Sequence, residues 1–377
     1  MILYMLVAAI TIGVACLVRK TAYIGHADRQ RVLNTLCIAA IFTILTLLAA
    51  LRIEVGNDYG TYVVTCHEIF QGGYVVTEPG YNLVVRILYT LSGSENYLLM
   101  FGVFGAAIVL IFLKCMYDGS DCFALSFLLF MLLGIYFRSF NTVRYYFALA
   151  LALYAARFLV DIKEDTIQKI IKFVLVIAIA ATFHKSVLVV IPLYLIARIP
   201  WNKWMYIAVA LGGAGIYVFR DKVMELALLL YPSYKDTIYV DQIHSFTENA
   251  PMIARIIMVI VLCACCYKSA IVSRADNRMY LNMSIMALVL YVSCYWMPLV
   301  TRFGYYLITP QILLVPNVIF SINSADKRRK LIALTVLVAL VIFAYFLKTA
   351  SAEGIRVLPY KSWLFYDHRW LNQTDTF

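Results

Sequence analysis

The strongest constraint on the fold of this chain is a series of apolar runs, each of about 18 residues, that recurs along almost its whole length. A helix of about that length crosses the hydrocarbon core of a bilayer and satisfies its own backbone hydrogen bonds there. With 63% hydrophobic residues among 377, the chain has more apolar side chain than a soluble globule of this size can bury. We therefore predict an all-α, polytopic membrane protein, with one integral membrane domain over residues 1–377.

Hydropathy predicts about twelve transmembrane helices. The first run, Ile2 to Val18, is too long for the core of a signal peptide and has no basic residue before it, so we count it as a membrane-spanning helix. The twelve are expected near residues 2–18, 34–51, 97–115, 122–137, 143–160, 169–183, 186–200, 203–219, 252–268, 279–298, 303–322 and 331–347.

The basic residues predict the orientation of these helices. If residues 80–92 do not cross the membrane, alternate loops carry basic clusters such as Arg29 with Arg31 and the run Lys327 to Lys330. Counted from the sequence, these loops hold 18 of the 32 Lys and Arg residues and eight acidic residues. Cytoplasmic loops are enriched in Lys and Arg, so we expect both termini outside.

Three segments are then expected on the outer side, at residues 52–95, 220–250 and 348–377. The second should begin with an amphipathic helix from Asp221 to Leu230. The third is rich in aromatic residues, which suits a tail that lies in the membrane interface.

The first outer segment has the highest density of ionisable groups between apolar runs. Asp58 is predicted to cap a short helix from Tyr59 to Phe70. Pro79 is predicted to begin an amphipathic or re-entrant helix over 80–92. Glu78, Asn82 and Arg86 recur every four residues and so share one face of this helix, where they suit either sugar hydroxyls or an internal ion pair.

Several classes of protein and site are excluded. Most of the nine cysteines fall in or beside predicted helices, so no disulfide framework is expected. Neither a zinc nor a paired-carboxylate spacing is present, nor a glycine-rich phosphate loop, so we expect no metal and no cofactor. The net charge of +11 comes from residues dispersed between apolar runs, which does not indicate nucleic-acid binding.

Arginines at outer helix ends are candidates for a binding site. Arg144 and Arg302 each follow a threonine predicted to cap a helix, and Arg255 lies about a turn into a helix expected to open at Asn249 to Pro251. A cation in the first turn is unfavourable by roughly 0.3–1 kcal/mol, because the helix N-terminus is itself positive. Such arginines favour a phosphate held between them. Alternatively, each pairs with a lipid headgroup or an outer acidic residue.

Acid–base candidates lie on the same side. His184, in Ala-Thr-Phe-His-Lys-Ser, ends one predicted helix and immediately precedes another. A helix C-terminus favours its protonated form while Lys185 opposes it, so its pKa is expected near neutrality. A histidine at a membrane boundary also commonly has a structural role. Asp58 and Glu78 are the other candidates.

Five features in this order resemble the EpsG family, the Wzy-like polymerases of bacterial exopolysaccharide, capsule and O-antigen. They are Gly-x-Asp-Tyr-x-x-Tyr at 56–62, Glu-Pro-Gly-Tyr at 78–81, Arg144 at a helix start, Phe-His-Lys-Ser at 183–186 and Arg-x-x-Tyr-Tyr at 302–306. The resemblance implies a multi-pass protein of the bacterial cytoplasmic (inner) membrane that joins undecaprenyl-diphosphate-linked oligosaccharide units on its outer face. Besides membrane lipids, it implies a chain-length regulator and a flippase as partners.

Under this resemblance, Arg144 and Arg302 hold the diphosphate, helped by Arg52 or Arg255. One of His184, Asp58 and Glu78 takes the proton of the acceptor hydroxyl. The residues expected to face the sugar are Tyr81, Asn82 and Arg86.

Two other functions remain open at this point. A transporter or flippase would also bind a lipid diphosphate, but it should place charges deep within its helices and often shows internal repeats. A membrane-bound O-acyltransferase would also use a histidine at the membrane boundary, but it gives no reason for a diphosphate site.

Overall fold

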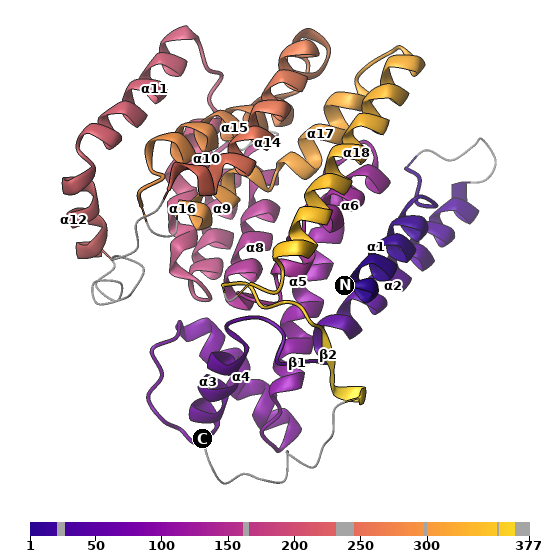
Figure 1. Cartoon of the computed structure of the whole chain (residues 1–377), viewed down its shortest axis with the longest axis vertical. Coiled ribbons are helices and arrows are strands. Elements are labelled where there is room, and N and C mark those ends of the chain that lie inside the picture. The colour runs from indigo at the N-terminus through magenta and orange to yellow at the C-terminus, as the bar shows by residue number, and fades with distance from the viewer. Residues whose placement is uncertain (21–26, 161–165, 231–244, 298–299, 353, 366–377) are drawn as a thin grey trace. The chain divides into compact units, whose positions relative to one another are not determined.

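The computed structural model describes residues 1–20, 27–160, 166–230, 245–297, 300–352 and 354–365 (Figure 1). It is 79% helical, and in this part of the chain the one sheet is a pair of two-residue strands. The all-α prediction is therefore confirmed. The chain divides into two compact units. Unit 1 comprises Met1–Ala150, Ile179–Lys185 and Arg329–Phe377, and unit 2 comprises Leu151–Ala178 and Ser186–Arg328.

Unit 1 contains both termini and the first outer segment. Its elements are α1 (Ile2–Ala15), α2 (Ala27–Ala50), β1 (Arg52–Ile53), α3 (Tyr59–Phe70), α4 (Pro79–Ser92), α5 (Tyr97–Gly119), α6 (Phe123–Leu132), α7 (Ile135–Arg138), the first part of α8 (Val143–Val160), the end of α9 (Thr166–Ala181), most of α18 (Ala325–Thr349), β2 (Lys361–Ser362) and the 3-10 turn η4 (Trp363–Phe365).

Unit 2 is built around α15 (Ala275–Ser293), which contacts α10, α11, α14, α16 and α17. Its other elements are the rest of α8 and α9, η1 (Lys185–Val189, from Ser186 onward), α10 (Val190–Arg198), α11 (Lys203–Val218), α12 (Arg220–Leu230), α14 (Phe246–Cys265), the π-helix η3 (Tyr267–Val272), α16 (Val300–Ile308), α17 (Gln311–Phe320) and the start of α18.

Each of the twelve predicted membrane helices overlaps at least one helix of the structure. Among the described residues, six helices are long and apolar enough to cross a bilayer, namely Asp28–Ala50, Tyr97–Gly119, Val143–Val160, Phe246–Cys265, Val300–Phe320 and Ala325–Thr349. The multi-pass prediction is thus supported, while the count of twelve crossings stays a prediction. Three shorter apolar helices are Ile2–Ala15, Phe123–Leu132 and Lys203–Val218.

Both helices predicted in the first outer segment are present, although the Asp58 side chain makes no capping hydrogen bond to α3. α3 spans Tyr59–Phe70 with Asp58 as its N-cap residue. α4 begins at Pro79, whose fixed φ suits the first helical position. It ends at Gly93, which adopts the left-handed conformation (φ +66°) that glycine tolerates best. α4 is 14 residues long, too short for a helix that spans a bilayer.

The C-terminal segment pairs with the start of this outer segment. β1 and β2 are antiparallel, with Arg52 opposite Ser362. The Gly56 N–H donates to the Arg356 carbonyl at 2.8 Å, and the Tyr4 hydroxyl donates to the Val357 carbonyl at 2.7 Å. The N-terminal helix, the first outer segment and residues 354–362 therefore meet at one end of unit 1, as expected if they share one side of the membrane.

Arg52 is buried where these segments meet. Its side chain is 1% exposed, and its guanidinium lies 4.2 Å from the ring centre of Phe101 and 4.9 Å from that of Phe140. It donates to the Ala49 carbonyl at 2.6 Å, at the C-terminus of α2, where a cation is favoured. Burial lowers the pKa of Arg52 to about 10, so the group is still charged at neutral pH. Among the described residues, no carboxylate pairs with it.

The contacts of Arg52 predict that lysine cannot replace it. A lysine ammonium retains the charge but loses the planar stack between two rings and the forked donors. We expect Arg52→Lys to lower the free energy of unfolding by about 2 kcal/mol, measured by thermal unfolding of the purified protein. Arg31→Lys, which changes an exposed arginine that does not contact Phe101 or Phe140, is the control. Equal melting temperatures for the two variants would contradict a structural role for Arg52.

Two predicted helix starts in unit 2 are wrong. α14 begins at Phe246, not at Asn249 to Pro251, because Ser245 and Glu248 form a reciprocal capping box. Arg255 is consequently the tenth residue of α14 and not in its first turn. α16 begins at Val300, so Thr301 lies inside the helix. For the second outer segment, α12 closely matches the predicted helix; residues 231–244, with Pro232, lie outside the described residues.

Candidate active site

Three segments of unit 1 converge on the carboxylate of Glu78. Glu78 is the N-cap residue of α4, with an extended backbone conformation, and its side chain makes no capping hydrogen bond. Arg144 is the second residue of α8. His184 follows the turn that ends α9. We name Glu78, Arg144 and His184 the Glu78 cluster.

Both oxygens of Glu78 face groups that can donate hydrogen bonds. Oε2 forms an ion pair with Nη1 of Arg144. Oε1 accepts a hydrogen bond from the backbone N–H of Lys185 at 3.3 Å and lies 3.7 Å from Nδ1 of His184. The three side chains are 12%, 23% and 15% exposed for Glu78, Arg144 and His184, so the cluster is shielded but reachable. One carboxylate thus links a guanidinium and an imidazole.

Gly80 makes the approach of α4 to the His184 turn possible. Its N–H donates to the Thr182 carbonyl at 2.8 Å. A β-carbon at position 80 would lie 2.2 Å from Oγ1 and 2.8 Å from Cβ of Thr182. Close packing therefore requires glycine at position 80. The contact with Thr182 also holds Glu78 beside His184.

Aromatic rings form the buried wall of the site. The Tyr62 hydroxyl accepts a hydrogen bond from the Arg144 backbone N–H at 3.2 Å. The Arg144 guanidinium lies 5.8 Å from the ring centre of Tyr62 and 5.4 Å from that of Tyr81. Burial raises the pKa of both phenols, although Arg144 opposes the shift. Both tyrosines therefore remain neutral at physiological pH and support the arginine as ring faces and hydrogen-bond partners, not as bases.

His184 has its own aromatic neighbour. The ring of Tyr145, the residue after Arg144, lies edge-on to the imidazole with centroids 5.4 Å apart. Phe183, buried beside it, packs edge-on against Phe104 and Phe147. These contacts restrict the rotation of the histidine turn and hold the imidazole near Glu78.

The other candidates in the first outer segment lie around the cluster without joining it. Asn82 is half-buried and hydrogen bonds through both side-chain atoms to Thr77. Arg86 is exposed, two turns of α4 after Glu78. Asp58 is half-buried, and its backbone N–H donates to Oδ1 of Asn141 at 3.0 Å, three residues before Arg144. Glu78, Asn82 and Arg86 therefore recur every four residues of α4 and its N-cap, as predicted. Glu78, however, forms its ion pair with Arg144 and not with Arg86.

The remaining predicted arginines occupy other places. Arg52 is enclosed between Phe101 and Phe140 in the junction described above. Arg255 is buried in α14 and 7% exposed, and Arg302 is half-buried in the first turn of α16. Both belong to unit 2.

Several residues of this site were not singled out from the sequence. Tyr62 is the last tyrosine of the Gly-x-Asp-Tyr-x-x-Tyr motif, and Tyr145 directly follows Arg144, but a single buried tyrosine has no sequence pattern of its own. Thr182 stands two residues before His184 and could have been found only through its contact with Gly80. In the described part of the chain, no group of three or more His, Cys, Asp and Glu residues could hold a metal ion.

Comparison with known families gives one match. The model of the EpsG family matches residues 35–362, which include the entire Glu78 cluster. No curated protein matches the chain, and no solved structure does. The family is associated with exopolysaccharide biosynthesis, and the apolar helices agree with a multi-pass membrane protein. The motif resemblance is confirmed over most of the chain, which belongs to the EpsG family.

Proposed function

We propose that this protein is a glycosyltransferase that polymerises oligosaccharide units linked to undecaprenyl diphosphate, on the outer face of the bacterial inner membrane. The observation that supports it best is the meeting of Arg144 and His184 on one carboxylate, Glu78, from segments far apart in the chain. Family membership supports the same class of reaction. A growing glycan on its lipid diphosphate is the donor, and a second lipid-linked unit is the acceptor.

In this proposal Arg144 binds the diphosphate of the donor. Guanidinium groups bind phosphate oxygens through two parallel hydrogen bonds and stay charged as the leaving group develops negative charge. Glu78 engages Nη1, while Nε of Arg144 is buried and has no hydrogen-bond partner among the described residues. In this proposal the diphosphate therefore meets the exposed part of the guanidinium and not the buried Nε. The Arg144 side chain is 23% exposed, which is compatible with access from the outer side.

His184 is the proposed base. Both oxygens of Glu78 already face donors, so the carboxylate is better placed to act on His184 electrostatically, across 3.7 Å to Nδ1, than to accept a proton itself. The acceptor hydroxyl loses its proton to Nε2 of His184 as its oxygen bonds to the anomeric carbon. The bond between that carbon and the diphosphate oxygen breaks, and the lipid diphosphate leaves with its electron pair.

The proposal keeps the roles that the sequence predicted for most of the other candidate residues. Arg302 and Arg255, both in unit 2, stay predicted phosphate-binding residues. Asp58, Tyr81, Asn82 and Arg86 would contact sugar. Arg52 fits a structural role better, since its guanidinium is 1% exposed. A chain-length regulator and a flippase of the same pathway are the proposed protein partners.

Replacement of His184 tests the proposal in cells. We expect His184→Ala to reduce long polymer by about 10²-fold, the usual size of a lost general base, and to leave single repeat units at the cell surface. The measurement is an electrophoretic ladder of surface polysaccharide at matched protein levels. His67→Ala, which removes an exposed histidine of α3, is the control and should give wild-type ladders.

Two outcomes would contradict the proposal, one in cells with His184→Ala and one in cells that lack the protein. Wild-type ladders from His184→Ala would remove the histidine from the chemistry. Loss of the single units as well as the polymer, in cells without the protein, would indicate a flippase or transporter, because a polymerase is not needed to export one unit.

A further inference from the structure

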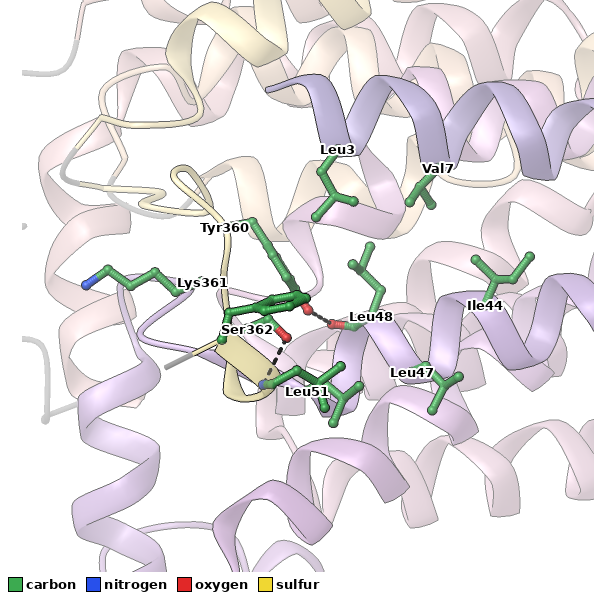
Figure 2. A pocket seen from close by; sticks show the side chains of 11 residues that line it. Leu3, Val7, Ile44, Leu47, Leu48, Leu51, Tyr360, Lys361 and Ser362 are labelled. Atoms are coloured by element: carbon green, nitrogen blue, oxygen red, sulfur yellow. Dashed lines mark hydrogen bonds between the residues drawn. The ribbon is translucent and has the colours of Figure 1, made fainter. Parts of the chain in front are cut away.

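A cavity of about 580 Å³ lies at one end of unit 1, away from the Glu78 cluster, none of whose residues lines it. Leu3 of α1, Leu47 and Leu48 of α2, and Leu364 and Phe365 of the C-terminal segment form much of its apolar wall. Figure 2 shows Leu3 of α1 and Leu48 of α2 pointing toward one another, with Tyr360 beside them. Its volume is in the range of sites that hold a small ligand or one chain of a lipid.

The polar groups at this cavity are already bonded within the protein. The Tyr360 hydroxyl donates to the Leu48 carbonyl at 3.0 Å, and the Lys361 ammonium pairs with Glu54. The Ser362 hydroxyl accepts from the Leu364 N–H at 3.4 Å. In Figure 2 the Lys361 side chain extends away from the leucines. Most of the lining is aliphatic or aromatic, and these polar groups already have partners in the protein, so the cavity suits hydrocarbon.

The position of the cavity indicates that the hydrocarbon comes from membrane lipid. α2 is long and apolar enough to span a bilayer, and Leu47 on its wall is 51% exposed. The cavity therefore opens toward lipid. Its polar end is formed by Tyr360, Lys361 and Ser362, just after the C-terminus of α2, at the depth expected for lipid headgroups. Lys361 at this end pairs with Glu54, which weakens its attraction for a diphosphate.

We propose that this cavity binds one acyl chain of a bilayer phospholipid, with the headgroup beside residues 360–362. The bound chain fills the space between α1, α2 and the C-terminal segment. It therefore stabilises the β1–β2 pairing that anchors the first outer segment. This site is independent of the polymerase reaction proposed above.

The test compares two tryptophan variants of the full chain. Leu47→Trp fills the cavity from its half-exposed edge. Leu36→Trp changes a 62% exposed leucine that lies 11 residues earlier on nearly the same face of α2 and does not line the cavity. Protein exchanged into vesicles of palmitoyl-oleoyl phosphatidylethanolamine is extracted, and retained phospholipid is counted by native mass spectrometry. We expect one phospholipid per chain in the wild type and in Leu36→Trp. Leu47→Trp should bind about tenfold more weakly, as expected when roughly two methylene groups lose their contacts.

A second measurement locates the bound chain. Phosphatidylethanolamine with a photoactivatable acyl chain should label peptides from 2–15 and 360–365 in the wild type and Leu36→Trp, and label them weakly in Leu47→Trp. Equal retention and equal labelling in the two variants would overturn the proposal. So would retention of an isoprenoid phosphate that phosphatidylethanolamine vesicles do not displace.

Discussion

Cells carrying Arg144→Ala are expected to lose long polysaccharide almost completely, with polymer reduced by about 10²–10³-fold. That is the usual cost of removing one group that stabilises developing charge. Arg144→Lys should restore little, since an ammonium keeps the charge but cannot bind phosphate with two parallel hydrogen bonds. Surface polysaccharide ladders, normalised to protein in the membrane, give the measurement.

The arginine also holds a shielded carboxylate, so its loss can destabilise the fold. Removal of one partner of a buried pair costs up to about 3–5 kcal/mol, and less here because Arg144 is partly exposed. The exchange variant Glu78→Arg/Arg144→Glu separates the two effects. It restores an ion pair and should recover the melting temperature, but it moves the guanidinium to α4 and should leave the polymer absent. Recovery of polymer in the exchange variant would show that the pair serves only the fold.

Gly80→Ala should inactivate the protein although it adds only one methyl group, in the first turn of α4. In an unobstructed helix, alanine is more favourable than glycine by about 1 kcal/mol. Here the new β-carbon would lie 2.9 Å from the Thr182 carbonyl oxygen and 2.8 Å from its β-carbon. Rotation of a side chain cannot relieve those contacts. α4 must move away from the His184 turn, and Glu78 moves with it.

We expect Gly80→Ala to lower the free energy of unfolding by about 1–3 kcal/mol, as overpacking commonly does, and to remove most long polymer. The matched control is Gly60→Ala in α3, where a β-carbon would meet no atom within 4 Å. That variant should be unchanged or slightly more stable. If the two variants melt and polymerise alike, the close approach of α4 to Thr182 does not position the site.

Local features of this fold were predictable because local rules govern them. Pro79 can begin a helix but cannot continue one, and Asp58 precedes residues with helical periodicity, so the bounds of α3 and α4 followed directly. The start of α14 was also encoded locally, in Ser245 and Glu248. Hydropathy placed it later because those capping residues are polar and precede the apolar run.

The pairing inside the site could not be predicted in this way. Glu78 and Arg144 are 66 residues apart, and no spacing rule connects residues at that distance. Charge patterning selected both as candidates. It left open whether Arg144 binds a phosphate or pairs with an outer acidic residue, and it could not name that residue. Arg52 was selected as a possible helper of Arg144 because it lies in the same outer segment as Glu78. Its burial depends on Phe101 and Phe140, which only the packing of α5 and the turn before α8 brings beside it.

The most direct test of the Glu78 cluster as the active site is polymerisation by purified protein. Wild type, His184→Ala and Arg144→Ala are reconstituted in vesicles and supplied with synthetic repeat units on undecaprenyl diphosphate. Released lipid diphosphate and product length are measured together. We predict one lipid diphosphate released for each unit joined by the wild type, and a rate at least about 10² lower in both variants. Wild-type rates in both correctly folded variants would contradict the assignment.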